Sequence, residues 1–143
     1  MTEERSEGRQ LFCRIITPER PVFDDEVDLV ITRIADGEIG VLVDHAPTVS
    51  TVEIGDVRIQ QGEEWSVYAT SDGFFKVSEN LVQILVEEAV PAEEINAEEA
   101  ESRVDEAEKA LSEADDEERD EILRRQRVGE NLVRVARRYG GEG

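Results

Sequence analysis

The sequence contains one cysteine and one histidine among its 143 residues, and this scarcity excludes several kinds of chemistry. Cys13 cannot form an internal disulfide, and a structural zinc site would have only Cys13 and His45 as soft ligands. Catalysis needs an activated nucleophile, a tuned acid or base, or a metal, and no second histidine remains to activate Cys13. No Walker-type Gly-Lys-Ser/Thr segment occurs either. We therefore expect no catalytic residue, no bound metal and no cofactor.

Long apolar runs and an excess of basic residues are also missing. The longest strand-like runs, such as Leu81–Val86, fall far short of the roughly 20 residues that cross a bilayer. The 36 acidic residues outnumber the 16 Lys and Arg, and the resulting net charge of −20 repels phosphate backbones and anionic lipid. The polar N-terminus lacks the features of a signal peptide. We expect a soluble cytoplasmic chain with a disordered lead-in over residues 1–9, no nucleic-acid partner and no direct membrane insertion.

Residues 10–88 have the short hydrophobic period of β-strands and predict an all-β domain. Their strand-length runs are rich in β-branched and aromatic residues. Short segments with Gly, Asp or Asn between the runs are typical of tight turns, among them Asp36-Gly37, Gly40 and Gly55-Asp56. The pattern predicts a β-sandwich or flattened barrel. The six runs are Leu11–Ile16, Val27–Ile34, Val57–Ile59, Trp65–Ala69, Phe74–Val77 and Leu81–Val86.

After Pro91 the composition changes, and residues 92–139 predict an antiparallel two-helix hairpin. This part contains no Phe, Trp or Thr and is rich in Ala, Glu and Arg. Asn96 and Glu99 fit an N-cap with a capping-box partner for a first helix over Ala97–Ala114. The acidic residues 115–118 suit a turn and the start of a second helix, which Gly140-Gly141 ends. The apolar stripes are Ala97, Ala100, Val104, Ala107 and Leu111 in the first helix, and Val128, Leu132, Val135 and Tyr139 in the second.

The sign of the charge reverses inside the helical part. Residues 91–121 contain 15 acidic and 3 basic residues, whereas residues 122–143 contain 2 acidic and 6 basic residues. In one interpretation the arginines pair with the acidic first helix across the hairpin. In the other they leave that helix for an acidic surface on a different protein, and the two interpretations are compatible. The basic set is Arg124, Arg125, Arg127, Arg134, Arg137 and Arg138.

The ordered motifs of the chain resemble the epsilon subunit of the bacterial F-type rotary ATP synthase. Residues 36–47 read DGEIGVLVDHAP, and Pro18–Phe23 precede them as a P-x-x-x-V/M-F type segment. Residues 55–59, GDVRI, and 71–74, SDGF, follow in the same order. The resemblance covers about residues 10–139. No single motif is catalytic, but the ordered set is specific.

This resemblance implies a non-catalytic rotor subunit, which is a peripheral subunit of a membrane complex and lies on the cytoplasmic side of the cell membrane. Its β-sandwich would attach to the central stalk, contact the gamma subunit and rest on the loops of the c-ring. Members of the family contact the ring through a glycine-rich loop. The matching positions in this sequence are Glu38, Ile39, Val41 and His45. The carboxylate of Glu38 would pair there with a basic residue of a ring loop.

For the hairpin, the resemblance implies a brake on ATP hydrolysis. Family members open the hairpin and insert its second helix among the catalytic alpha and beta subunits. The six arginines would then meet the acidic segment that the beta subunit presents. Some members also bind ATP through an Ile/Leu-Asp-x-x-Arg-Ala signature, which Asn96 and Glu99 interrupt here. Because Glu99 replaces a phosphate-pairing cation by a like charge, we expect no nucleotide binding.

Two alternatives belong to other functional classes. The chain would also suit a free-standing β-sandwich binding module with a helical tail. A metal-dependent enzyme would need a site built from Asp36, Glu38, Asp44 and His45. A histidine that hydrogen-bonds within its own turn is the more ordinary outcome for His45.

Overall fold

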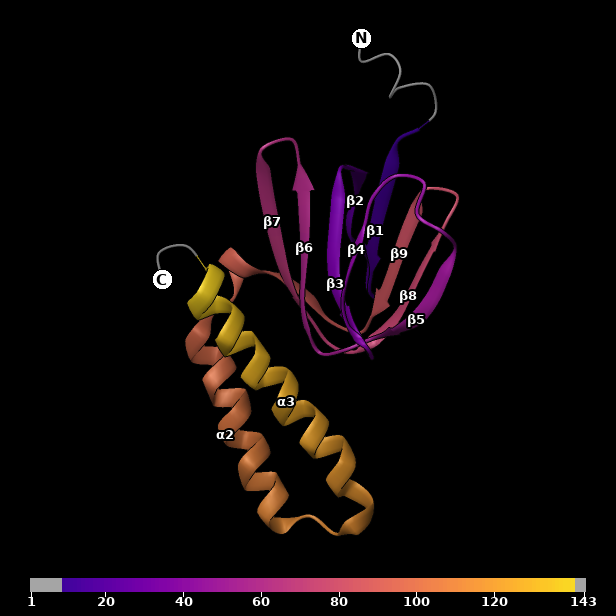
Figure 1. Cartoon of the computed structure of the whole chain (residues 1–143). Helices are drawn as coiled ribbons and strands as arrows, with labels where there is room; N and C mark the ends of the chain where they lie inside the picture. The colour runs from indigo at the N-terminus through magenta and orange to yellow at the C-terminus, as the bar shows by residue number, and fades with distance from the viewer. Residues whose placement is uncertain (1–8, 141–143) are drawn as a thin grey trace. The chain divides into compact units, whose positions relative to one another are not determined.

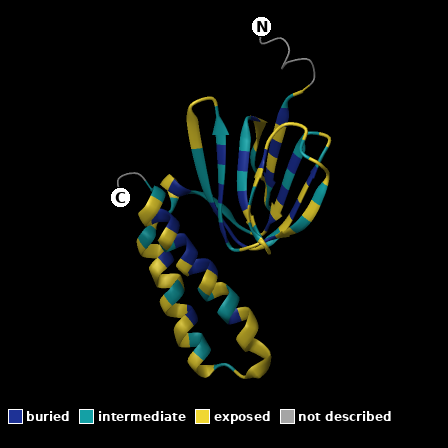
Figure 2. Cartoon of the chain, viewed as in Figure 1, coloured by how far each residue is buried: buried dark blue, intermediate teal, exposed yellow. Residues whose placement is uncertain are grey.

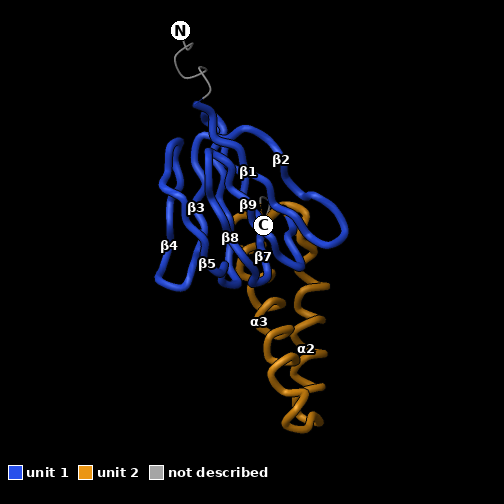
Figure 3. The backbone as a smooth tube through the Cα atoms, turned by 90° about the vertical axis from the view of Figure 1, so that its right-hand side faces the viewer, with its two compact units in different colours: residues 1–90 blue, residues 91–143 orange. Residues whose placement is uncertain are grey.

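The computed structural model describes residues 9–140 and divides the chain into two compact units, residues 1–90 and residues 91–143 (Figures 1 and 3). Apart from Arg9, the predicted lead-in of residues 1–9 lies outside the described residues. The first unit is all-β and the second is helical, in agreement with the predicted fold class.

The first unit is a single ten-stranded sheet that curls into a nearly closed sandwich (Figure 1). The sheet order is β10-β7-β6-β3-β5-β8-β9-β1-β2, with β4 paired to β3. The side chain of Gln61 on β6 donates a hydrogen bond to the backbone oxygen of Glu26 on β2 (2.9 Å), which ties the β2 end of the order back to its middle. The strands are β1 Leu11–Ile16, β2 Pro21–Val27, β3 Leu29–Ile34, β4 Gly37–Val41, β5 Thr48–Val52, β6 Gly55–Gln61, β7 Glu64–Thr70, β8 Gly73–Ser78, β9 Leu81–Val86 and β10 Ala89–Pro91.

Alternation along the strands fills the interior of this unit. In β1 the side chains of Leu11, Cys13 and Ile15 are buried, whereas Phe12 and Arg14 between them are exposed. The same period of two, which Figure 2 shows as alternating colours, follows from the pleat of a strand. The buried cluster is Leu11, Cys13, Ile15, Val27, Val30, Val41, Val52, Val57, Ile59, Phe75, Val77, Val82, Ile84 and Val86.

The six predicted runs all lie in strands, but the sequence analysis missed β2, β4, β5 and β10. The predicted run Val27–Ile34 is broken at Asp28, where β2 ends and β3 begins. Gly40, expected in a turn, lies inside β4 and pairs with Ile31, and Gly55 is the first residue of β6 and pairs with Thr70.

The second unit contains the 3₁₀ turn η1 Ala92–Glu94 and the helices α2 Ala97–Glu113 and α3 Asp116–Tyr139, which run antiparallel (Figure 1). The side chain of Asn96 accepts the backbone N–H of Glu99 at the start of α2, and Asp115 accepts that of Glu118 at the start of α3. Each cap satisfies a donor that the first helical turn leaves unpaired. The predicted N-cap at Asn96 is therefore confirmed, and the first helix ends one residue before the predicted Ala114.

Small residues allow the two helices to approach. Ala100 and Ala107 are buried on α2, and Gly129 is buried on α3. A Cβ atom placed on Gly129 would lie 3.0 Å from a methyl group of Val104, which is tighter than ordinary packing. The predicted alanine stripe of the first helix is thus the face that meets α3.

Candidate functional site

Glu38 is an exposed residue of β4 at the centre of an ion cluster. Arg58 on β6 donates from Nη2 to Oε2 of Glu38 at 2.6 Å, and Nη2 of Arg33 on β3 lies 4.0 Å from the same oxygen. Arg58 also contacts Asp56 through Nε at 3.3 Å. The four residues carry two positive and two negative charges, so together they have no net charge, although the unit as a whole is strongly acidic.

The predicted ring-facing residues do not share one loop. Glu38, Ile39 and Val41 belong to strand β4, where Ile39 pairs with Thr32 and Val41 with Val30. Val41 is completely buried, so its side chain is part of the core and not of the surface. The correction has a simple cause: the alternation of Glu38, Ile39, Gly40 and Val41 is that of a strand, in spite of the glycines.

His45 lies beyond β4, in the loop before β5. Its Nδ1 is 2.7 Å from the backbone oxygen of Ala46, and since a carbonyl only accepts, this bond requires a proton on Nδ1. The expected turn histidine is therefore confirmed. The loop is fixed by Asn80, whose Oδ1 accepts the backbone N–H of Asp44 at 2.6 Å, while Asp44 itself adopts a left-handed φ of 67°.

An exposed apolar row escaped the sequence analysis. Phe74 on β8 pairs with Leu85 on β9, and Leu85 pairs with Ile16 on β1, so their side chains are cross-strand neighbours on the outer face. Phe74 is 64% exposed and Leu85 is 45% exposed. Val49 on the adjacent strand β5 is 74% exposed. We call Val49, Phe74, Leu85 and Ile16 the apolar row. The alternation of residues within each predicted strand indicates which side chains face outward. It does not indicate how the strands align, so the row could not be predicted.

The six arginines lie on α3 and differ in their contacts. Arg137 pairs with Glu101 on α2 at 2.8 Å, as the first interpretation of the basic set predicts. Arg134 donates to the side-chain oxygen of Asn131 at 2.8 Å, and the guanidinium of Arg138 lies 5.3 Å from the ring centre of Tyr139. All six except Arg124, which is partly buried beside Glu121, are exposed. Spacings of three, seven and four place Arg124, Arg127, Arg134 and Arg138 along one side of the helix.

The structure also locates the residues of the interrupted nucleotide motif and of the metal alternative. The side chain of Asn96 is used as the cap of α2, and Glu99 is exposed on its first turn. Across residues 9–140, no group of three or more His, Cys, Asp or Glu is placed to hold a metal ion. Cys13 is buried, and burial, helped by the nearby charge of Asp24, raises the pKa of its thiol to about 12. A thiol with that pKa is a weak nucleophile near neutral pH.

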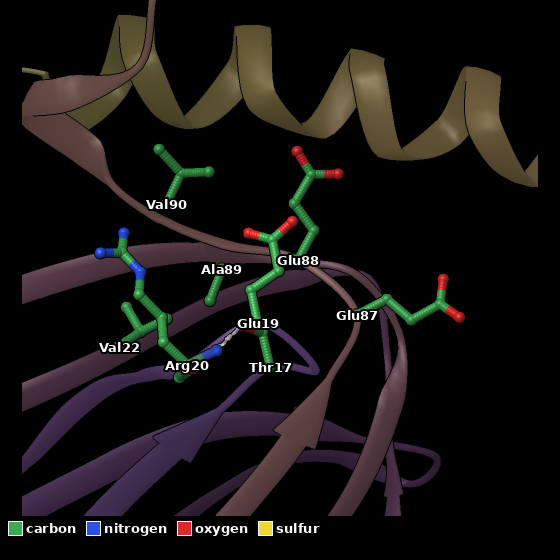
Figure 4. A pocket seen from close by; sticks show the side chains of 8 residues that line it. All are labelled: Thr17, Glu19, Arg20, Val22, Glu87, Glu88, Ala89 and Val90. Carbon is green, nitrogen blue, oxygen red and sulfur yellow. Dashed lines mark hydrogen bonds between the residues drawn. The ribbon is translucent and has the colours of Figure 1, made fainter.

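A polar pocket of about 470 Å³ opens beside the turn that follows β1 (Figure 4). The side chains of Glu19 and Glu88 point to the same side, and the backbone N–H of Arg20 donates to the hydroxyl of Thr17 at 3.4 Å. Its lining contains three carboxylates, one guanidinium and the hydroxyl of Thr17. The lining residues are Thr17, Glu19, Arg20, Val22, Glu87, Glu88, Ala89 and Val90.

In the described part of the chain, no helix has the length and apolar character of a membrane span. The described surfaces include an ion cluster, an exposed apolar row and a helix with basic residues along one side. Together with the sandwich and the hairpin, they define a class of proteins whose surfaces suit contacts with other proteins.

Comparison with known proteins gives the family. Residues 10–92 match the family model described as ATP synthase, Delta/Epsilon chain, beta-sandwich domain. The chain is 68% identical to the ATP synthase epsilon chain of Rubrobacter xylanophilus over 142 residues, which cover 94% of this chain and 97% of that protein. It is 40% identical to the chloroplastic ATP synthase epsilon chain of Chlamydomonas reinhardtii over 71% of this chain and 76% of the relative. The chain therefore belongs to the ATP synthase epsilon-chain family, a non-catalytic subunit of that complex.

Solved structures agree with this assignment. A chain in the Euglena gracilis mitochondrial ATP synthase structure of OSCP, F1 and c-ring matches with a TM-score of 0.74 and 26% identity, covering 89% of this chain and 81% of that one. A chain in the Tetrahymena thermophila mitochondrial ATP synthase structure of the central stalk and c-ring matches with a TM-score of 0.53 and 13% identity, covering 61% and 70%. The second likeness concerns the fold alone.

Proposed function

We propose that the chain is a rotor subunit of a proton-translocating ATP synthase. Its β-sandwich couples the gamma subunit to the c-ring, and its C-terminal helices restrain ATP hydrolysis by contacting the alpha and beta subunits. The chain is a peripheral subunit of this membrane complex and lies on the cytoplasmic side of the cell membrane. Membership of the epsilon-chain family supports the assignment, and the surfaces of the described residues support the separate contacts.

The apolar row is the observation that carries the coupling role. Phe74 and Leu85 expose large side chains next to each other on a sheet face, within a unit that holds 19 acidic and 7 basic residues. Contiguous exposed apolar side chains on an otherwise charged surface are typical of protein contacts. We assign this row to the gamma subunit, because a stable stalk contact needs a desolvated centre.

We assign the c-ring contact to strand β4 and the loop that follows it. Glu38, Ile39 and His45 supply the surface groups, and buried Val41 supports the strand from within. On α3 the exposed arginines present guanidinium groups that suit an acidic segment of the beta subunit. Arg137 would then exchange Glu101 for a carboxylate of that partner.

A binding experiment tests the coupling role. We expect the full chain with Phe74→Asp to bind the matching alpha, beta and gamma assembly at least tenfold more weakly, since a charge in a desolvated contact is costly. Surface plasmon resonance with the immobilised assembly measures this. Trp65→Asp is the control, because Trp65 is also an exposed aromatic residue (49%) but lies on β7, away from the row. Equal loss in both variants, or none in Phe74→Asp, would remove the row from the gamma contact.

A further inference from the structure

The ion cluster around Glu38 contacts only one of the two oxygens of its carboxylate. The hydrogen bond from Arg58 goes to Oε2, and the guanidinium of Arg33 also approaches that oxygen. Within residues 9–140, Oε1 of Glu38 accepts no hydrogen bond. The side chain of Glu38 is 47% exposed, so one oxygen is anchored and the other remains available as an acceptor.

Arg58 is itself fixed in place. Its side chain is only 25% exposed, and its Nε contacts Asp56, whose side chain is 12% exposed. Both residues lie on β6, which pairs with β3 and β7 on its two sides. A side chain held by packing and by a partly buried carboxylate makes a rigid support, in contrast to an exposed pair of two flexible side chains.

We infer that Arg58 is a positioning residue for Glu38. It fixes Oε2, and thereby presents Oε1 to an N–H donor on a basic side chain of the c-ring loop. This inference rests on the proposed ring contact and adds the group that prepares Glu38 for it. Because the carboxylate is already ordered, less conformational freedom is lost when the partner binds.

The charges around Glu38 determine the kind of contact. Arg33, Arg58, Glu38 and Asp56 sum to zero, so the cluster attracts a distant cation only weakly. The cluster then contributes a short-range hydrogen bond, while long-range attraction of a basic partner comes from the net negative charge of the rest of the unit. Changes at Glu38 or Arg58 should therefore raise the dissociation rate, while the association rate and its salt dependence remain nearly constant.

A double-mutant cycle tests the inference on the full chain bound to the gamma subunit, with a purified, detergent-solubilised c-ring as the probe. We expect Glu38→Gln and Arg58→Gln each to weaken ring binding by about tenfold, and the double variant to be no weaker than Glu38→Gln alone. Arg58→Lys should recover part of the affinity, since an ammonium still reaches one oxygen. Arg20→Gln, an exposed arginine outside the cluster, serves as the control and should bind as the unchanged chain does.

The outcomes are distinct. If Arg58→Gln weakens binding by the same factor with Glu38 and with Gln at position 38, Arg58 acts by itself and the positioning role is overturned. If Glu38→Gln binds normally, the acceptor role of Oε1 is overturned while the rotor function stands. If the unchanged chain fails to bind the ring, the proposed ring contact is overturned, and the role of Arg58 with it. Thermal unfolding of each variant separates lost stability from lost contact.

Discussion

The sandwich and the hairpin are stabilised in different ways. Large side chains such as Phe75, Ile15 and Ile84 fill the sandwich and are completely buried. The contact between α2 and α3 combines the small residues Ala100, Ala107 and Gly129 with larger buried side chains of α3 such as Leu132 and Val135. The alanines and the glycine bury little apolar area for each residue. The sandwich is therefore specified by the shape of its interior, whereas the hairpin joins a few large side chains to a close helix approach and helix caps. A smaller contact of this kind is easier to separate, as the proposed brake on ATP hydrolysis requires.

The largest effect should follow from a cavity in the sandwich. Phe75→Ala should lower the free energy of unfolding by about 3–5 kcal/mol, because it removes a fully buried aromatic side chain. Denaturant unfolding followed by circular dichroism measures the change. The neighbour Phe74 provides a matched control, since Phe74→Ala alters an exposed side chain and should cost less than about 0.5 kcal/mol. Similar losses for both would mean that Phe75 does not fill a tight core.

A smaller effect should follow from overpacking the hairpin. Gly129→Leu places a side chain where even a Cβ lies 3.0 Å from Val104, and we expect a local cost of about 1–3 kcal/mol. Hydrogen exchange should speed up in α2 and α3 but not in the strands. Val104→Ala in the same chain should restore part of the protection by making room. Faster exchange in the strands as well would show that the two units unfold together.

The smallest effect concerns the basic side of α3. Full chains with Arg127→Gln and Arg134→Gln should release ATP hydrolysis by the alpha, beta and gamma assembly about two- to fivefold, because two cations facing an acidic partner are lost. A steady-state ATPase assay at several salt concentrations measures the release, and added salt should reduce inhibition by the unchanged chain.

The matched control removes two exposed cations from elsewhere in the hairpin, Lys109 and Arg119, by substitution with Gln. This chain should inhibit as strongly as the unchanged one. If it releases hydrolysis equally, net charge and not the basic side of α3 determines inhibition. If neither chain changes the rate, the hairpin does not act as an electrostatic brake.

The bounds of the first helix were predicted to within one residue because its signals are local, while α3 begins inside the acidic stretch that was expected as a turn. Asn96 and Asp115 form caps with groups three residues away, and alanines at helical spacing give the buried face. The missed strands lack local signals. β2 carries consecutive acidic residues that face solvent, and β5 exposes Val49 opposite Lys76. Their pairing with distant strands gives them their structure, and no single segment shows that pairing.

The surfaces were predicted less completely than the fold. Glu38 and the six arginines are visible as charges, but the hydrogen bond between Glu38 and Arg58 joins residues 20 positions apart. The apolar row requires the alignment of β1, β8 and β9, which only the register of the sheet supplies. Val41 shows the opposite error, since a motif position that resembles a contact residue is a core position.

The parallel pairing of β1 with β9 has a consequence for how the chain folds during synthesis. Phe12 pairs with Leu81, so almost the whole sheet must be synthesised before the second edge of β1 is covered. Until then β1 can pair only with β2, and its open edge is able to join a strand of another chain. The contacts of the hairpin are nearer in sequence and need no such delay. Once β9 has been synthesised and has paired with β1, the nascent chain no longer offers this strand edge to another chain.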